Sequence, residues 1–243
     1  MRESRRIAIV TGGGKRVGAV IAQALLDDGW AVIAHVHHDM DSVPDGAIKV
    51  VADLAENDCA VKIFTAADEL GPVNLLVNNA ARFSFDGFGS VDPDEFDAHL
   101  RVNARAPMLL IDELARRHQD GKALVVNLLD AKLSAPNADF LSYTVSKYAL
   151  AGLTEVAARA LAARGIRVNA IAPALMLPSG EQGEANFEAV HDLNPLRRGI
   201  EVTDVVSALR YLIDSAGTTG QTITLDGGQR FMALNRDVQF MEQ

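Results

Sequence analysis

Two side chains near the middle of the chain have types and spacing suited to moving a proton. Tyr143 and Lys147 are four residues apart, which places both on one face of a helix. An ordinary tyrosine has a pKa of about 10, and a nearby ammonium lowers it because the positive charge favours the phenolate. A phenol acidified in this way can serve as a general acid near neutral pH. The same spacing arises by chance in many helices, so other features must support this interpretation.

Asp130 lies thirteen residues before Tyr143 and could take part in the same chemistry. A carboxylate would repel the oxyanion that develops when a simple carbonyl is reduced. It would instead suit a substrate that offers N–H donors or needs a ring nitrogen protonated, and paired titratable groups often push each other's pKa apart. The alternative is that Asp130 is only a turn residue.

A glycine-rich loop, TGGGKRVG from Thr11 to Gly18, follows an apolar run and precedes a helical pattern. Glycines let the backbone approach a ligand closely, and the helix that follows directs free N–H groups and its positive dipole end at the loop. The loop therefore predicts a pyrophosphate site of a dinucleotide. Arg16 could bind a phosphate or stack on a flat ring, or it could be a solvated loop charge. The residues expected to contact the cofactor here are Gly12, Gly14, Lys15, Arg16, Val17 and Gly18.

The second expected strand, AVIAHVHH, bears on the choice of dinucleotide. A carboxylate at the end of this strand binds the ribose hydroxyls of NAD. Here the strand ends in histidines, the first acid is the late Asp39, and Lys15 lies in the loop nearby. This pattern favours NADPH, with His37 and His38 at its ribose. A metal site is not expected, because alternation places His38 on the opposite face from His35 and His37, and no cysteine or acidic cluster joins them.

Two asparagines follow another apolar run, at Asn78 and Asn79. They could form a plain turn, but a turn at the carboxyl edge of a parallel sheet is where ligands bind. Together with the glycine loop and the Tyr143–Lys147 pair, this segment resembles the short-chain dehydrogenase/reductase family over nearly the whole chain. Further matches are Asn103 in RVNARAP and the ending TLDGG, whereas Arg16 and Ala81 stand where most relatives have glycine.

The resemblance implies roles for further residues. Asn103 would hold a water that relays protons to Lys147, although an asparagine in mid-helix can also bond a backbone carbonyl and bend the helix. Lys147 would also bind the ribose hydroxyls of the cofactor. The cofactor site implied by the family would further include Asp53, Leu54, Asn79, Ala80, Tyr143, Lys147 and Pro173.

Within this family the chain is most similar to the pteridine reductase and dihydromonapterin reductase branch. Most relatives place a serine where this chain has Asp130, whereas that branch has aspartate there, arginine at the place of Arg16 and a ring-stacking aromatic at the place of Phe83. The implied substrate site comprises Arg16, Phe83, Asp130 and Tyr143, which would clamp a flat heterocycle. Phe83 could alternatively pack in the core.

Three functions remain open from the sequence. The first is an NADPH-dependent enzyme that reduces a C=N bond of a dihydropterin or dihydrofolate-type ring, with Tyr143 as general acid. The second is an NADPH-dependent carbonyl reductase or alcohol dehydrogenase, such as a 3-oxoacyl-carrier reductase, for which serine would suit better than Asp130. The third is a non-catalytic dinucleotide sensor, which would have no need of Asn103, Tyr143 and Lys147.

The elements that must position these residues alternate along the chain. Apolar runs without a polar alternation predict strands of a parallel sheet covered on both faces. Alternating strands and helices predict one doubly wound α/β domain over residues 1–243, a seven-stranded Rossmann fold, with a substrate lid at 175–200. The expected strands are Ile7–Val10, Ala31–Val36, Ile48–Val51, Leu75–Val77, Leu124–Leu128, Arg167–Ile171 and Thr222–Leu225. The expected helices are Val17–Asp28, Asp58–Leu70, Asp94–Arg117, Tyr143–Ala163 and Thr203–Ile213, with Gly29, Gly71 and Gly165 as C-terminal stops.

Composition narrows the class of protein. The 243 residues carry a net charge of −9, which disfavours nucleic acid and anionic membranes as partners. The single cysteine, Cys59, excludes an intrachain disulfide, and neither a signal peptide nor a membrane span is expected. We therefore expect a soluble cytoplasmic protein that acts on a small molecule. The resemblance further implies a homotetramer, built from the helices Asp94–Arg117 and Tyr143–Ala163.

Overall fold

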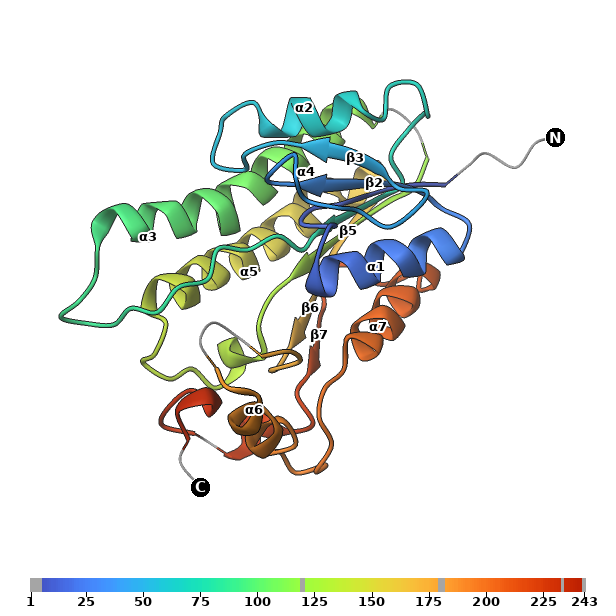
Figure 1. The fold of residues 1–243 in the computed structure, drawn as a ribbon. Coiled ribbons are helices and arrows are strands. Elements are labelled where there is room, and N and C mark those ends of the chain that lie inside the picture. Colours follow the sequence, from blue (N-terminus) through green and yellow to red (C-terminus); the bar gives the residue numbers. More distant parts are fainter. Residues whose placement is uncertain (1–5, 119–120, 179–181, 233, 242–243) are drawn as a thin grey trace.

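A seven-stranded sheet forms the centre of the computed structural model, which describes residues 6–118, 121–178, 182–232 and 234–241 (Figure 1). The strand order is β3-β2-β1-β4-β5-β6-β7, and every pairing is parallel. The structure confirms the predicted doubly wound α/β fold, and the predicted strand ends differ from the observed ones by at most two residues. The strands are β1 (Ile7–Val10), β2 (Ala31–Val36), β3 (Ile48–Val51), β4 (Leu75–Asn78), β5 (Ala123–Leu128), β6 (Ile166–Pro173) and β7 (Thr222–Leu225).

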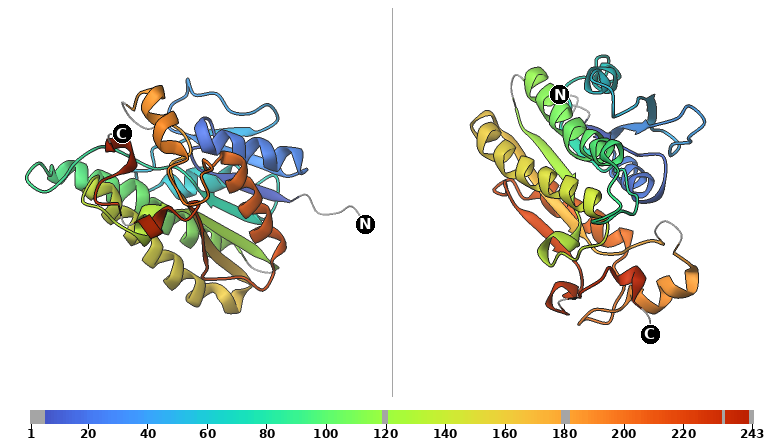
Figure 2. Two further views of the ribbon diagram at one scale, coloured as in Figure 1. Left: turned by 90° about the horizontal axis from the view of Figure 1, so that it is seen from below. Right: turned by 90° about the vertical axis from the view of Figure 1, so that its left-hand side faces the viewer.

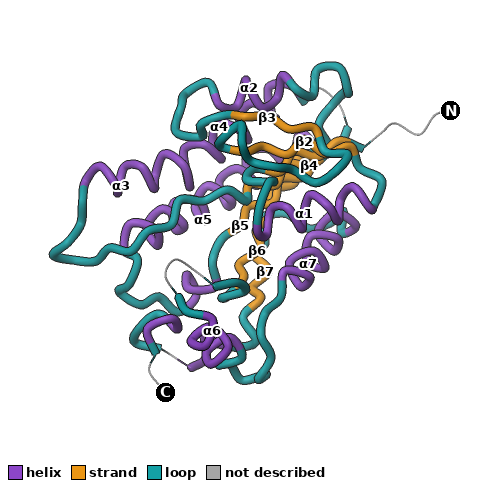
Figure 3. Tube along the Cα trace, viewed as in Figure 1, coloured by secondary structure: helices purple, strands orange, loops and turns teal. Residues whose placement is uncertain are grey.

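Helices cover both faces of the sheet (Figure 3). On one face, α1 (Arg16–Asp27) and α7 (Val202–Asp214) pack on strand residues such as Ala8 and Val10. On the other face, α2 (Cys59–Thr65), α4 (Ala106–Arg117) and α5 (Leu141–Leu161) pack on residues such as Ile7 and Ile9. Successive residues of β1 thus serve opposite cores, which explains why the whole strand is apolar.

The helix predicted at Asp94–Arg117 is interrupted. It consists of α3 (Pro93–Leu100), a π-helical turn (Arg101–Arg105) and α4. In this turn the Ala106 N–H reaches back to the Arg101 carbonyl, a wider bond than in an α-helix. Asn103 lies inside the turn and is 1% exposed, so the irregular backbone turns its side chain into the protein.

Two other helix predictions need correction. α2 ends at Thr65 rather than Leu70, because the chain continues in turns with bonds from Ala67 N to Phe64 O and from Leu70 N to Ala67 O. Gly71 therefore closes a turn, not a helix. The predicted stops at Gly29 and Gly165 have φ of +81° and +74°, as left-handed residues after a helix do.

The region predicted as a lid contains a helix that the sequence analysis did not predict, α6 (Glu184–His191). It lies beside the C-terminal 3₁₀ turn η5 (Val238–Phe240), at the end of the molecule below β6 and β7 (Figure 1, and Figure 2, right). Three residues of the predicted lid, 179–181, lie outside the described residues. Among the helices that the structure describes, none has the length and apolar character to cross a membrane.

Candidate active site

A cavity of about 750 Å³ opens at the carboxyl ends of the strands. It lies where β1 and β4 are neighbours, the point at which the strand order reverses and where ligands bind in open α/β sheets. Every catalytic, cofactor-binding and substrate-binding residue predicted from the sequence lines this cavity except His38 and Asn103.

Two glycines of the first loop are held against other backbone atoms. A Cβ at Gly14 would lie 2.4 Å from the Ser42 carbonyl oxygen, and a Cβ at Gly18 would lie 2.0 Å from the Gly12 carbonyl oxygen. Both distances are too short for any side chain. The loop therefore needs glycine at these positions to bring its backbone N–H groups to the cavity at the N-terminus of α1.

A buried histidine holds this loop in place by a hydrogen bond. His35 is 2% exposed; its Nδ1 accepts the Gly12 N–H at 3.2 Å, and its Nε2 bonds the Ala52 carbonyl at 2.9 Å. Burial lowers the pKa of His35, so the neutral ring that accepts from Gly12 is favoured. The loop is thus tied to the end of β3 before any ligand contacts it.

Arg16 has φ of +51°, a left-handed conformation that costs a side chain about 1–2 kcal/mol. This conformation explains why a glycine would be natural here. The Arg16 guanidinium donates to the Pro178 carbonyl at 2.8 Å, so it connects the glycine loop to the start of the predicted lid. Arg16 thereby reaches across the mouth of the cavity.

The proposed proton donor is hydrogen-bonded to the aspartate. The Tyr143 hydroxyl donates to Asp130 Oδ2 at 2.9 Å, and Asp130 Oδ1 accepts the Lys132 N–H at 2.8 Å. Lys147 donates its ammonium to the Leu128 carbonyl at 2.6 Å and lies 5.6 Å from the centre of the Tyr143 ring. Tyr143 and Asp130, thirteen positions apart in sequence, thus form one polar unit at the end of β5.

The expectation that Lys147 acidifies Tyr143 is wrong for this arrangement. Burial and the neighbouring Asp130 carboxylate raise the pKa of Tyr143 well above its ordinary value. Burial also lowers the pKa of Lys147 to about 8 and raises the pKa of Asp130. Tyr143 therefore keeps its proton at neutral pH. The Tyr143 phenol and the Asp130 carboxyl therefore titrate as a pair, and Tyr143 is not acidified by itself.

Asn103 connects two segments next to Tyr143 by hydrogen bonds. Its amide nitrogen donates to the Arg82 carbonyl at 2.9 Å and to Ser146 Oγ at 2.8 Å, and its oxygen accepts the Arg82 N–H at 2.7 Å. The contacts join the segment after β4 to α5, which carries Tyr143. The water relay implied for Asn103 stays a prediction.

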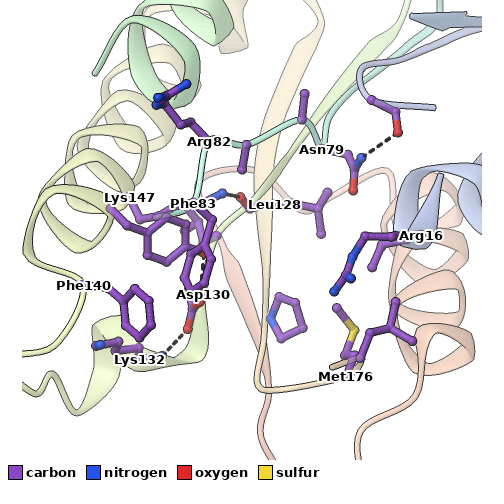
Figure 4. Close-up of a pocket in the computed structure, with 18 of the residues that line it drawn as sticks. Arg16, Asn79, Arg82, Phe83, Leu128, Asp130, Lys132, Phe140, Lys147 and Met176 are labelled. Carbon is purple, nitrogen blue, oxygen red and sulfur yellow. Dashed lines mark hydrogen bonds between the residues drawn. The ribbon is translucent and has the colours of Figure 1, made fainter. Parts of the chain in front are cut away.

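Aromatic rings form the wall next to Asp130. Phe83 stacks on Phe140 with ring centres 4.5 Å apart and meets the Tyr143 ring edge-on at 4.7 Å. Phe83 is 40% exposed, so it is not a core residue. Figure 4 shows Phe83, Phe140 and Asp130 together on one side of the cavity, with Arg16 and Met176 across from them.

The expected ribose end of the cavity has a mixed charge. Lys15 and His37 line it, and His37 Nε2 lies 3.8 Å from Asp53 Oδ2. His38 lies outside the lining and packs on the His37 ring at 4.1 Å. Asp41 also lines the cavity, and its carboxylate accepts the His38 N–H at 3.0 Å. The sequence analysis did not identify this acid, since it lies in the irregular segment beyond β2.

Comparison with known proteins agrees with this geometry. A family model described as enoyl-(acyl carrier protein) reductase matches residues 14–230. The chain belongs to the short-chain dehydrogenase/reductase family. It is 34% identical to bovine L-xylulose reductase, with 94% of this chain and 98% of that protein covered. Pteridine reductase 1 of Leishmania tarentolae is 31% identical, with 91% and 95% covered.

A solved structure of another family member is similar throughout. FolM alternative dihydrofolate reductase 1 from Brucella suis, crystallised in complex with NADP, superposes with a TM-score of 0.87 at 34% identity. The match covers 94% of this chain and 96% of that one. As a short-chain dehydrogenase/reductase, this chain is an oxidoreductase that acts on a small molecule.

Several cavity residues of this short-chain reductase were not predicted from the sequence. They lie between Asp130 and Tyr143 and near the C-terminus, where no motif marks them: Lys132, Phe140, Arg236, Asp237 and Val238. Their place in the site depends on contacts between segments about a hundred residues apart, such as that between Lys132 and Asp237.

Proposed function

We propose that this protein is an NADPH-dependent reductase of a pteridine-type ring, a dihydropterin or dihydrofolate, and that Tyr143 and Asp130 deliver the proton. The observation that carries this proposal is the 2.9 Å hydrogen bond between Tyr143 and Asp130 inside an aromatic-walled cavity. A carboxylate beside the donor suits a substrate with N–H groups and opposes a developing oxyanion. Similarity to pteridine reductase 1 and to the FolM structure in complex with NADP supports it.

The dinucleotide fits the first loop. Close packing at Gly14 and Gly18 lets the loop present its N–H groups to the cavity at the start of α1, and a cavity of about 750 Å³ is within the range of ligand pockets. Lys15 and His37 would face the 2′-phosphate, and Lys147 the ribose of the nicotinamide. Bound there, the reduced cofactor supplies the hydride to the carbon of the C=N bond.

The chain's own part is the proton. The Tyr143 hydroxyl gives its proton to the ring nitrogen that receives the electron pair. A proton on the Asp130 carboxyl then returns to the phenolate oxygen along their hydrogen bond. The raised pKa of Asp130 makes this proton available closer to neutral pH, while Lys147 offsets the phenolate charge. The pair thus acts as one donor.

The second candidate is a sugar or other carbonyl reductase. The 34% identity to L-xylulose reductase over nearly its full length favours it. In such an enzyme the Asp130 carboxyl would have to stay protonated while the oxyanion forms, donating a hydrogen bond to it, whereas in the pteridine reductase it gives up its proton.

NADPH oxidation, followed by absorbance, separates the candidates. Dihydrobiopterin, dihydrofolate, L-xylulose and a 3-oxoacyl thioester would be tested at matched concentrations. We expect the highest kcat/KM with a reduced pterin. Turnover of L-xylulose with none of either pterin would reject the pteridine proposal in favour of carbonyl reduction.

The fit of the loop can be tested with Gly18→Ala. The added Cβ would lie 2.0 Å from the Gly12 carbonyl oxygen and must displace the loop. Overpacking of about 1–3 kcal/mol predicts a Kd for NADPH about 10- to 100-fold higher, measured by fluorescence titration. Gly152→Ala on α5 is the matched control, because a Cβ there meets nothing within 4 Å. Equal affinity in both variants would contradict the assigned loop.

The rate of reduction should depend on pH with a definite sign. The donor pair must carry its proton and Lys147 its charge, and both are lost as pH rises. Because burial lowers the pKa of Lys147 to about 8, we expect kcat to fall above pH of about 8. A pH–rate profile at saturating NADPH and substrate measures this. A kcat that rises steadily through that range would exclude the donor assignment.

We also propose the homotetramer expected from the family. Apolar side chains remain exposed on α4 and α5: Met108, Val145, Tyr148 and Val156. Sedimentation velocity would test the assembly, and a monomer would reject it.

A further inference from the structure

Lys132, two residues after Asp130, forms an ion pair with Asp237. The Lys132 side chain is only 8% exposed. Its ammonium donates to the Asp139 carbonyl at 2.5 Å and to Asp237 Oδ2 at 3.2 Å, and it lies 5.2 Å from the centre of the Phe140 ring. The same residue donates its backbone N–H to Asp130 Oδ1. Lys132 thus joins Asp130 to the C-terminal segment.

The C-terminal segment, residues 234–241, is fastened to this place by a second pair. The Asp139 carboxylate is 9% exposed; it accepts Arg236 Nε at 2.8 Å and the Asp237 N–H at 2.8 Å. Asp237 in turn caps η5 by accepting the Gln239 N–H at 3.3 Å. Asp237 is therefore fixed in direction as well as in position.

Aromatic contacts complete the connection. Phe240 stacks on Phe140 at 5.8 Å, and Phe140 stacks on Phe83 in the substrate wall at 4.5 Å. Arg236, Asp237, Val238 and Gln239 themselves line the cavity. The C-terminal segment therefore closes the cavity, although the contacts described above for the glycine loop and for Tyr143 do not include it.

We propose that Asp237, acting through the Lys132 ammonium, is a positioning residue for the Asp130 carboxyl. The titratable and charged groups near Asp130 are Tyr143 and Lys147 from α5 and Asp237 from the C-terminal segment, with the Lys132 ammonium bound to Asp237. The pair of opposite charges holds the 130–134 turn in place. The Asp237 charge raises the pKa of both Asp130 and Tyr143, and the Lys132 ammonium lies against that charge and offsets it.

The proposal predicts shifts of opposite sign when the two partners are removed separately. Asp237→Asn leaves the Lys132 charge uncompensated, so the pKa of Asp130 should fall. Lys132→Met leaves the Asp237 charge uncompensated, so the pKa of Asp130 should rise. Carbon NMR of the full-length protein with ¹³C-carboxyl aspartate would follow the titration, and the Asp130 signal is assigned by its loss in Asp130→Asn.

Three further variants separate charge from structure. Lys132→Arg keeps the positive charge and should keep the wild-type midpoint. Arg236→Gln loosens the segment while both partners keep their charges, so its midpoint gives the shift that loosening alone produces. Arg159→Gln breaks an exposed ion pair with Glu155 elsewhere on α5 and serves as the remote control.

Opposite shifts in Asp237→Asn and Lys132→Met support the proposal. Unchanged midpoints, or shifts of the same sign in both, overturn it, since loosening of the segment alone would move both variants alike. If Lys132→Met does not fold, Asp237→Asn decides by itself: a lower midpoint supports the proposal and an unchanged one rejects it. The proposal rests on Asp130 as part of the proposed donor, but the titration needs no substrate. A failure to reduce pterins would therefore reject the proposed function without changing this result.

Discussion

Tyr143→Phe is expected to lower kcat about 10²- to 10⁴-fold, the usual contribution of a general acid, while the Kd for NADPH stays within a few-fold of wild type. The hydroxyl is the group that donates to Asp130, and the ring beside Phe83 would remain in place. Loss of the hydroxyl therefore removes the source of the proton that the reacting nitrogen receives, but it leaves the cavity wall almost unchanged. Single-turnover reduction with preloaded NADPH would measure the chemical step directly.

Tyr148→Phe is the matched control for this variant. Tyr148 lies on the same helix, 44% exposed, and its hydroxyl donates to the Leu133 carbonyl outside the cavity lining. It should turn over like the wild type. If Tyr143→Phe kept the wild-type single-turnover rate, Tyr143 would be a packing residue and the proton would have to come from another group.

Asp130→Ser is expected to lose pterin reduction selectively. The serine hydroxyl is too short to replace both carboxylate contacts, so a ring N–H loses its charged acceptor. Hydrogen bonds to charged groups contribute about 1.5–3 kcal/mol, which predicts a kcat/KM for the pterin about 10- to 100-fold lower. A serine can donate to a carbonyl oxygen, so any turnover of L-xylulose should be kept or increased.

Asp130→Asn isolates the charge, because the amide has nearly the shape of the carboxylate. It should lower pterin reduction as Asp130→Ser does, but without the gain for the carbonyl substrate that comes from a small hydroxyl. Pterin kinetics unchanged in both variants would reduce Asp130 to a turn residue. An equal loss for every substrate would instead assign Asp130 a general role in supporting Tyr143.

The sheet was predictable because its signal is local. The inner strands of a parallel sheet bury both faces, so Ile7–Val10 is apolar throughout, Ala31–Val36 is apolar except for His35, and the ends of both runs agree with the structure. Helix interruptions were not predictable in this way. The π-helical turn at Arg101–Arg105 depends on contacts of Asn103 with Arg82 and Ser146, which belong to other segments.

The same distinction between local and long-range signals applies to the candidate site. Gly12, Gly18, Asn79 and Tyr143 stand in recognisable motifs, and the structure brings them to one cavity. The state of Tyr143 was predicted wrongly, because helical spacing shows that Lys147 is near but not that the Tyr143 hydroxyl is buried and bonded to Asp130. The residues of the C-terminal segment carry no motif, and their part in the cavity depends on Asp139 and Lys132 far earlier in the chain.

These contacts give a physical reason for an aspartate at position 130. A buried tyrosine with a raised pKa is a weak acid by itself, and a neighbouring carboxyl that can hold a proton compensates for this. A serine hydroxyl would offer no such reserve. In the proposed mechanism the same carboxyl would then accept a ring N–H, so one residue would serve both proton delivery and substrate recognition.

A crystal structure of the complex with NADP and a dihydropterin tests the central claim most directly. We predict a pterin ring between Phe83 and the nicotinamide, with the Tyr143 hydroxyl and an Asp130 oxygen each within hydrogen-bonding distance of a ring nitrogen. A structure in which the Tyr143 hydroxyl points away from the ring, or in which Asp130 makes no contact with it, would contradict this account.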